Sequence, residues 1–235
     1  MAAYLESTIV SYIRRHIRRM EGDGPGRLPS EHELATRFSV SRMTIRSAYL
    51  SLEEMGLVSS RQGKGHFAAP KRKTIGLSLS GETSFTDKMR ELGLELETRA
   101  VACGYSKRKP NVWAALGAGD DDRVFRFGRL RVVEGKAVAL HVSYLKLADF
   151  PDLPARAVTV SSLFAYFREK GFERFSSSGT ILGVAFPTKK EAGFLQVGHL
   201  VPLLTCESDT LDAVTGAVLQ FSRILYRGDA FQYRL

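Results

Sequence analysis

The first half of the fold is decided by residues 28–67, which read LPSEHELATRFSVSRMTIRSAYLSLEEMGLVSSRQGKGHF. Ser30 and Glu33 have the spacing of a capping box, so a helix is expected to begin after Ser30. Ser41 offers a second N-cap after a short break, and Gly56 suits the end of the helix that follows. Two short helices separated by a tight turn are the signature of a helix-turn-helix.

The second of these helices carries polar side chains at its start. Arg42 and Arg46 are four residues apart and share one face, and Ser41 and Thr44 lie at the same end. A recognition helix places such N-terminal residues in the major groove of DNA. Arginine can bind guanine O6 and N7 bidentately, while hydroxyl groups hold phosphates. A solvated helix face is the alternative interpretation.

A β-hairpin with a basic, glycine-rich tip is expected after this helix. The tip reads Arg61-Gln62-Gly63-Lys64-Gly65 between two short strands. Glycines allow close approach to a phosphate backbone, and Lys64 adds positive charge. A nucleotide-binding P-loop is rejected because the strands are very short and no phosphate-loop helix follows.

The charge distribution also favours a polyanionic partner for this half. The chain has 235 residues and a net charge of +9, and residues 1–73 hold 13 Lys/Arg against 7 Asp/Glu. Residues 5–20 place apolar side chains at helical spacing with arginines mostly off that stripe, which predicts one further amphipathic helix. A basic but merely solvated surface is the alternative.

Several classes of protein are excluded by the same composition. Cys103 and Cys206 are far apart, with no CxxC or Cys/His cluster, so no metal site, cofactor or disulfide framework is expected. The N-terminus is amphipathic rather than a signal peptide, and no run of about 18 apolar residues occurs. We therefore expect a cytoplasmic protein that does not span a membrane.

The second half predicts an α+β domain with an antiparallel sheet. The domains are expected at residues 1–69 and 76–235, joined by a basic linker at 70–75. Helices are expected over 84–93, from Ser161 or Ser162, and from Thr188. The expected strands cover 96–104, 123–134, 137–145, 177–185, 202–211 and 217–227.

Residues 5–69 resemble the winged helix-turn-helix of GntR-type regulators in order, spacing and residue type. The resemblance implies a mostly α domain with a small β wing that binds double-stranded DNA. Many relatives have arginine where this chain has His32. The DNA contacts that the resemblance implies come from His32, Ser41, Arg42, Thr44, Arg46, Gln62, Gly63, Lys64 and Gly65.

Residues 76–235 resemble the effector-binding (UTRA) domain of the HutC branch, whose fold is similar to that of chorismate lyase. The resemblance lies in SFTDKMRELG, FRFGRLRVVEGKAVALHVSYL and VLQFSRILYRGDAFQYRL. In relatives, an arginine pair and hydroxyls at two helix starts hold the anionic part of an effector. Here those positions are Arg129 and Arg131, Ser84 or Thr86, and Ser162.

Strand periodicity is consistent with such a site. Arg129 and Arg131 are two residues apart, so both point to one face, about 7 Å from each other. His141 shares a face with Ser143, and Gln220 shares a face with Tyr226, which adds three candidate ligand contacts. An exposed basic strand remains the alternative for the arginines, and plain N-capping the alternative for Ser84 and Ser162.

The sequence therefore predicts a homodimeric repressor that an anionic metabolite releases from a palindromic operator. Phosphosugar-sensing relatives often carry an acid near His141 and Gln220, which leaves both a sugar phosphate and a carboxylate catabolite open. The sequence leaves two other functions open. One is a lyase-like enzyme using His141 beside the arginines, although no catalytic motif compels it. The other is a DNA-binding protein without an effector.

Overall fold

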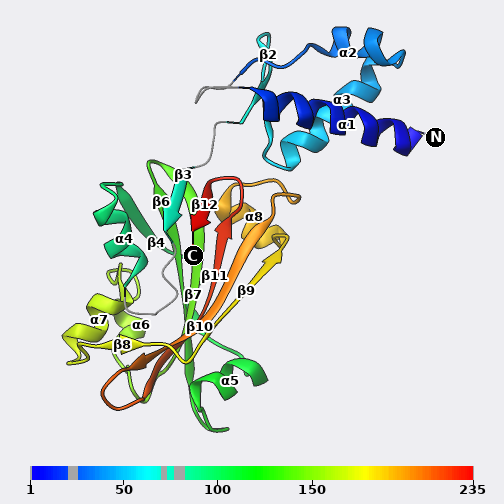
Figure 1. Ribbon diagram of the computed structural model, residues 1–235. Helices are drawn as coiled ribbons and strands as arrows, with labels where there is room; N and C mark the ends of the chain where they lie inside the picture. Colours follow the sequence, from blue (N-terminus) through cyan, green and yellow to red (C-terminus); the bar gives the residue numbers. More distant parts are fainter. Residues whose placement is uncertain (1, 21–25, 70–72, 77–82, 235) are drawn as a thin grey trace. The chain divides into compact units, whose positions relative to one another are not determined.

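The structure, a computed structural model, describes residues 2–20, 26–69, 73–76 and 83–234, which divide into two compact units (Figure 1). The first unit comprises Met1–Lys73, Phe186–Pro202 and Gly228–Ala230. The second comprises Thr74–Ala185, Leu203–Arg227 and Phe231–Leu235. Strand β3 (Lys73–Gly76) takes up residues 73–75 of the expected linker, and residues 70–72 lie outside the described chain.

Local capping shapes the helices of the first unit. Ser30 and Glu33 form both hydrogen bonds of the capping box, and Ser41 accepts a 3.2 Å hydrogen bond from the Thr44 backbone. Ser39 adopts the left-handed conformation (φ 52°) that makes the turn between the two helices. Three helices result: α1 (Ala2–Arg19), α2 (Glu31–Phe38) and α3 (Arg42–Glu54).

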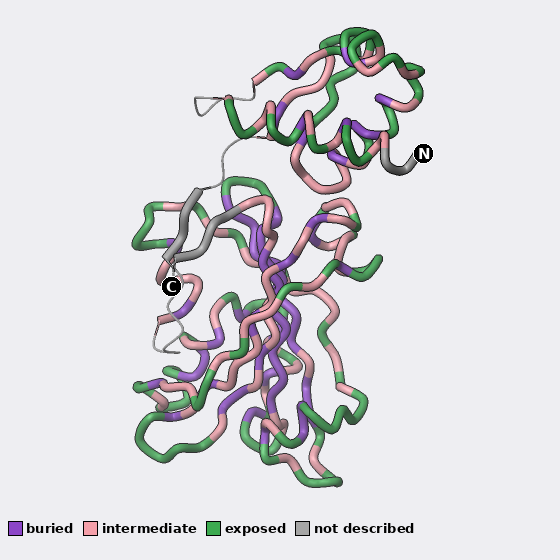
Figure 2. The backbone as a smooth tube through the Cα atoms, turned by 45° about the vertical axis from the view of Figure 1, so that its right-hand side comes forward, coloured by how far each residue is buried: buried purple, intermediate pink, exposed green. Residues whose placement is uncertain are grey.

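The apolar faces of these helices close around one core. Ile9 and Ile13 of α1 are fully buried against Leu34 of α2 and Ile45 of α3. Buried and exposed residues alternate along the tube of this unit (Figure 2). The wing is a two-stranded antiparallel hairpin of β1 (Val58–Arg61) and β2 (Gly65–Ala68). The predicted winged helix-turn-helix is therefore confirmed.

An eight-stranded sheet forms the body of the second unit. Its paired strands are antiparallel, in the order β4-β6-β7-β11-β10-β8, with β5 on β6 and β9 on β10. A separate two-stranded sheet pairs β3 with β12 (Phe231–Arg234). The strands of the large sheet are β4 (Leu96–Ala100), β5 (Gly104–Tyr105), β6 (Val124–Val133), β7 (Lys136–Lys146), β8 (Phe175–Ser176), β9 (Thr180–Ala185), β10 (Leu203–Asp212) and β11 (Val218–Arg227).

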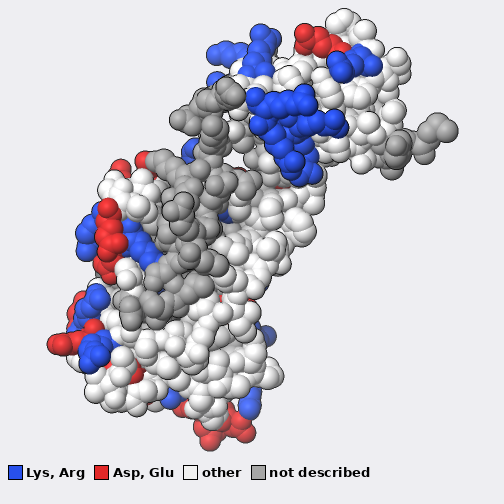
Figure 3. Space-filling model, viewed as in Figure 1, with Lys and Arg blue, Asp and Glu red and all other residues white. Residues whose placement is uncertain are grey.

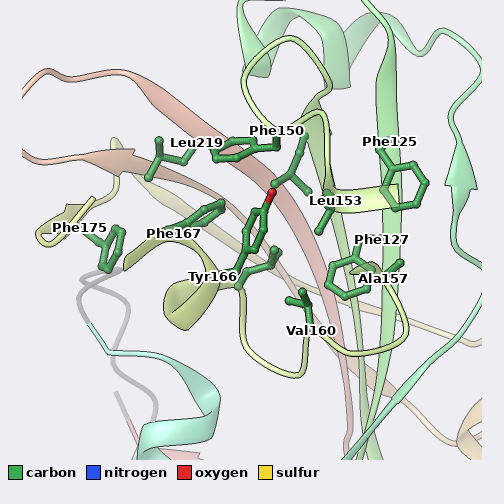
Figure 4. Packing of buried hydrophobic residues seen from close by; sticks show 12 residues of the cluster. Phe125, Phe127, Phe150, Leu153, Ala157, Val160, Tyr166, Phe167, Phe175 and Leu219 are labelled. Carbon is green, nitrogen blue, oxygen red and sulfur yellow. The ribbon is translucent and has the colours of Figure 1, made fainter. Parts of the chain in front are cut away.

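Helices lie on both sides of this sheet (Figure 1). On one side lie α4 (Phe85–Glu91), α6 (Leu153–Arg156) and α7 (Leu163–Glu169). Residues of α6, α7 and β6 pack there with Phe150 in an aromatic core (Figure 4). α5 (Pro110–Leu116) contacts β7 and β11 on the other side. The remaining helix, α8 (Lys189–Leu195), belongs to the first unit and begins after Thr188 as expected.

The expected elements of this half are confirmed with some corrections. The strand expected over 96–104 is two strands, because Ala102 takes a positive φ of 51° and breaks the run. The strand expected from residue 177 begins at Thr180. α5 and α6 were not predicted from the sequence. No described helix is long and apolar enough to cross a membrane.

We predict that Gly128→Ala destabilises the protein. Gly128 lies in β6, where an added Cβ would overlap the backbone carbonyl of Val101, which cannot move independently. The free energy of unfolding should fall by about 2 kcal/mol or more in urea denaturation. Gly179→Ala is the control, since a Cβ there meets nothing within 4 Å. Equal stability of the two variants would contradict the packing described here.

Candidate functional site

The predicted DNA-contacting residues gather around one hollow of the first unit. The hollow has a volume of about 620 Å³ and lies between the start of α2, the exposed side of α3 and the wing. Six of the nine predicted residues line it, namely His32, Arg42, Arg46, Gln62, Gly63 and Gly65. The recognition helix and the wing therefore present their polar side chains to a common surface.

The other three predicted residues lie next to this hollow in the chain. Ser41 and Thr44 are held together at the start of α3, with their hydroxyl oxygens 3.0 Å apart. Lys64 is exposed at the wing tip, where its backbone N–H closes the turn onto the Arg61 carbonyl at 2.9 Å. Lys and Arg side chains form broad basic areas on this unit (Figure 3). This surface can therefore meet a phosphate backbone.

A second group of polar residues is buried on one face of the large sheet. Arg129 pairs with His141 across β6 and β7, and Arg131 pairs with Ala139 two residues along. Tyr226 of β11 pairs with the same Ala139, so its side chain lies on the same face. We call Arg129, Arg131, His141 and Tyr226, together with Phe85 of α4, the arginine cluster.

Arg129 and Arg131 are buried residues, at 4% and 2% exposure, so an exposed basic strand is ruled out. Arg129 donates to the Ser143 hydroxyl at 3.0 Å. Arg131 donates to the Thr98 hydroxyl at 2.6 Å and to the Ser161 carbonyl at 2.9 Å. Within the described residues, neither arginine forms an ion pair with a carboxylate, and both Nε atoms have no partner.

Aromatic rings enclose these charges. Phe85 stands with its ring centroid 5.1 Å from that of His141, and the Arg131 guanidinium lies 5.8 Å from the Phe85 centroid. Tyr226 packs at 5.8 Å from His141. Sequence reasoning missed Phe85, although it stands between the predicted Ser84 and Thr86. The rings lower the local dielectric, which strengthens any charge–charge contact made there.

The hydroxyl groups at the helix starts are partly engaged. Ser84 caps α4 and donates to the Asp87 carboxylate at 2.7 Å, and Ser162 caps α7 by accepting from the Ala165 backbone. The Thr86 hydroxyl is buried and, in the described chain, has no partner. Both serines therefore act as helix caps. Ser162 directly follows Ser161, whose backbone carbonyl accepts a hydrogen bond from Arg131.

Gln220 shares the face of the cluster but lies away from it. It is four residues along β11 from Ile224, the partner of His141, which corresponds to about 13 Å at the strand rise. Its amide nitrogen donates to the Thr210 hydroxyl at 2.9 Å. The sequence correctly placed Gln220 on this face but could not give its distance from the arginines.

Burial and mutual repulsion shift the titration of the cluster. Burial, followed by the charge of Arg131, lowers the pKa of Arg129, and burial lowers the pKa of Arg131 to about 10. Burial, with both arginines adding, holds the pKa of His141 well below 6.5. His141 is therefore neutral at pH 7, and its Nε2 has no partner among the described residues. Two buried positive charges beside a neutral imidazole favour an anion.

The winged helix-turn-helix and its basic hollow define a DNA-binding transcription regulator, here joined to an antiparallel α+β domain. The comparisons agree. Residues 5–67 match the model of the bacterial regulatory proteins of the gntR family, and residues 91–232 match that of the UTRA domain. The chain belongs to the UTRA-containing branch of the GntR family.

Relatives cover nearly the whole chain. The mannosyl-D-glycerate transport/metabolism system repressor MngR of Escherichia coli is 27% identical over 97% of this chain and 93% of its own length. The repressor NagR of Bacillus subtilis is 26% identical, with 96% and 91% covered. The crystal structure of PhnF from Mycobacterium smegmatis has 25% identity and a TM-score of 0.60, with 97% and 98% covered. MngR and NagR are named repressors, and the N-terminal family model is that of regulatory proteins, so the lyase interpretation is wrong.

We predict that the neutral state of His141 makes stability depend on pH. The unfolded chain takes up a proton at this histidine below about pH 6.5, whereas the native state does not. Stability from this group is therefore complete above pH 6.5 and decreases as the pH falls. Between pH 7.5 and 5.5, urea unfolding should show wild type losing about 1 kcal/mol more than His141→Gln. Identical losses in both proteins would contradict a neutral His141.

Proposed function

We propose that this protein is a homodimeric repressor released from a palindromic operator by a small anionic effector. The effector binds at the arginine cluster and is a sugar phosphate or a carboxylate-bearing catabolite. MngR and NagR are named repressors, which supports repression rather than activation. We further propose that the protein acts in the cytoplasm, with residues 1–69 as its DNA-binding domain and 76–235 as its effector-binding domain.

One observation carries the effector proposal: two buried guanidinium groups have no carboxylate partner in the described part of the chain. An uncompensated buried charge destabilises the folded protein by several kcal/mol, so binding of an anion next to it is favourable. The arginines offer planar donor pairs that match carboxylate and phosphate oxygens. The neutral His141 and the buried Thr86 hydroxyl add polar groups that suit the rest of a metabolite.

Specificity on DNA is assigned to the hollow of the first unit. Arg42 and Arg46 reach base edges from the recognition helix, while Ser41 and Thr44 hold the backbone at its start. The wing residues 62–65 bind phosphate, and His32 contacts the DNA from α2. Two copies of this arrangement read a site with two-fold symmetry, which supports a dimer on a palindrome.

The proposal is tested by fluorescence anisotropy on labelled DNA from just upstream of the gene. Sugar phosphates and carboxylate catabolites are added singly to wild type, Arg129→Met and the matched control Arg126→Met. Arg126 lies on the same strand, but its side chain points to the opposite face of the sheet. One compound class should weaken DNA binding of wild type and Arg126→Met about tenfold or more, within the usual range of allosteric coupling.

Arg129→Met should bind DNA as wild type does, because the substitution lies in the second unit, but should not respond to that compound. Normal release of Arg129→Met would show that the effector binds elsewhere. Tight DNA binding by wild type that no compound disturbs would favour the effector-free alternative.

A further inference from the structure

A histidine of the wing lies against α2 and α3, and α3 carries both Arg42 and Arg46. His66 lies on β2 and lines the hollow together with Glu31, Arg42 and Tyr49. Its side chain is only 13% exposed, although the neighbouring wing tip is open to solvent.

The ring of His66 lies flat on the ring of Tyr49. The two centroids are 3.7 Å apart and the planes differ by 5°. Tyr49 is itself fixed, since it is 1% exposed and its hydroxyl donates to the Pro29 carbonyl at 2.5 Å. The wing strand is therefore stacked on the recognition helix by two planar groups that leave little freedom to rotate.

Both ring nitrogens of His66 also have polar neighbours. Nδ1 lies 2.6 Å from the Ser60 hydroxyl, on the opposite strand of the wing. Nε2 lies 3.5 Å from one carboxylate oxygen of Glu31, at the start of α2. The other oxygen of Glu31 lies 3.5 Å from the guanidinium of Arg42. One carboxylate thus joins the wing histidine to an arginine of the recognition helix.

We propose that His66 is a positioning residue for DNA recognition, acting through Glu31 on Arg42. The stack on Tyr49 fixes the wing against α3, and the Glu31 carboxylate, held by His66, sets where the Arg42 guanidinium points. Arg42 is 69% exposed, so without this link its long side chain samples many rotamers. A fixed guanidinium loses less entropy when it binds a base edge, which increases its contribution to affinity.

The proposal rests on the proposed DNA-binding role of Arg42 and is tested with a double-mutant cycle. Operator affinity is measured by anisotropy for wild type, Arg42→Ala, His66→Phe and the double variant. Phenylalanine keeps a ring on Tyr49 but has no nitrogen to bond to the Ser60 hydroxyl or the Glu31 carboxylate. Arg42→Ala should weaken wild-type binding about tenfold, as expected for a base-reading arginine. In the His66→Phe background, the same change should weaken binding by less than about threefold.

The matched control replaces Arg42→Ala with Arg46→Ala in the same cycle. Arg46 lines the hollow but is not paired with Glu31. Arg46→Ala should therefore weaken operator binding by the same factor in both backgrounds. If His66 has a purely structural role, His66→Phe will change the loss of affinity caused by Arg42→Ala and by Arg46→Ala to the same extent. That result would overturn the proposal. Equal costs of Arg42→Ala in both backgrounds would also overturn it.

A second variant tests the proposal independently of whether His66→Phe folds correctly. Glu31→Gln removes the charge of the link at a partly exposed position without touching the stack, and it should reduce the cost of Arg42→Ala in the same way. If Glu31→Gln leaves that cost at its wild-type value, the link does not position Arg42. If Arg42→Ala does not weaken wild-type binding at all, the DNA-binding role of Arg42 itself is wrong.

Discussion

The burial of two guanidinium groups on one sheet face is the constraint on which the second unit depends. Removing Arg129 and Arg131 from water costs several kcal/mol each, which ordinary proteins recover by pairing with carboxylates. Here the described chain supplies only neutral acceptors, from Ser143, Thr98 and the Ser161 carbonyl. The sheet and its helices hold the two guanidinium groups in these buried positions. Because their charges are not neutralised by the described chain, an anion that binds there gains a favourable electrostatic interaction.

The hydrogen-bond acceptors of Arg131 lie on different elements of the fold, which is relevant to regulation. Arg131 joins β4 to the turn before α7, and Phe85 brings α4 over the same guanidinium. An anion that competes for Arg131 would therefore change the hydrogen bonds of the α7 start as well as its own surroundings. An effector can shift DNA affinity only if it binds the two states of the protein unequally. Groups that exchange partners on binding provide such a difference.

Sequence reasoning succeeded where the determinants are local. The caps at Ser30 and Ser41 were visible because capping residues act within three positions, and strand alternation correctly put Arg129 and Arg131 on one face. It failed where long-range packing decides. The distance of Gln220 from the arginines depends on strand register, and the stack of His66 on Tyr49 joins residues from two separate elements. The short helix α5 has no side-chain cap, but Pro110 at its first position and the left-handed Gly117 at its end are local signals that sequence reasoning missed.

The proposed function requires that one chain couples an anion site to a DNA-binding face, and thermodynamic reciprocity tests this coupling directly. Once a releasing compound is found, its affinity is measured by titration calorimetry with the free protein and with the protein saturated by operator DNA. If the two sites are coupled, operator weakens effector binding by the same factor by which effector weakens operator binding, about tenfold or more. An effector affinity that is unchanged by operator would contradict the coupling.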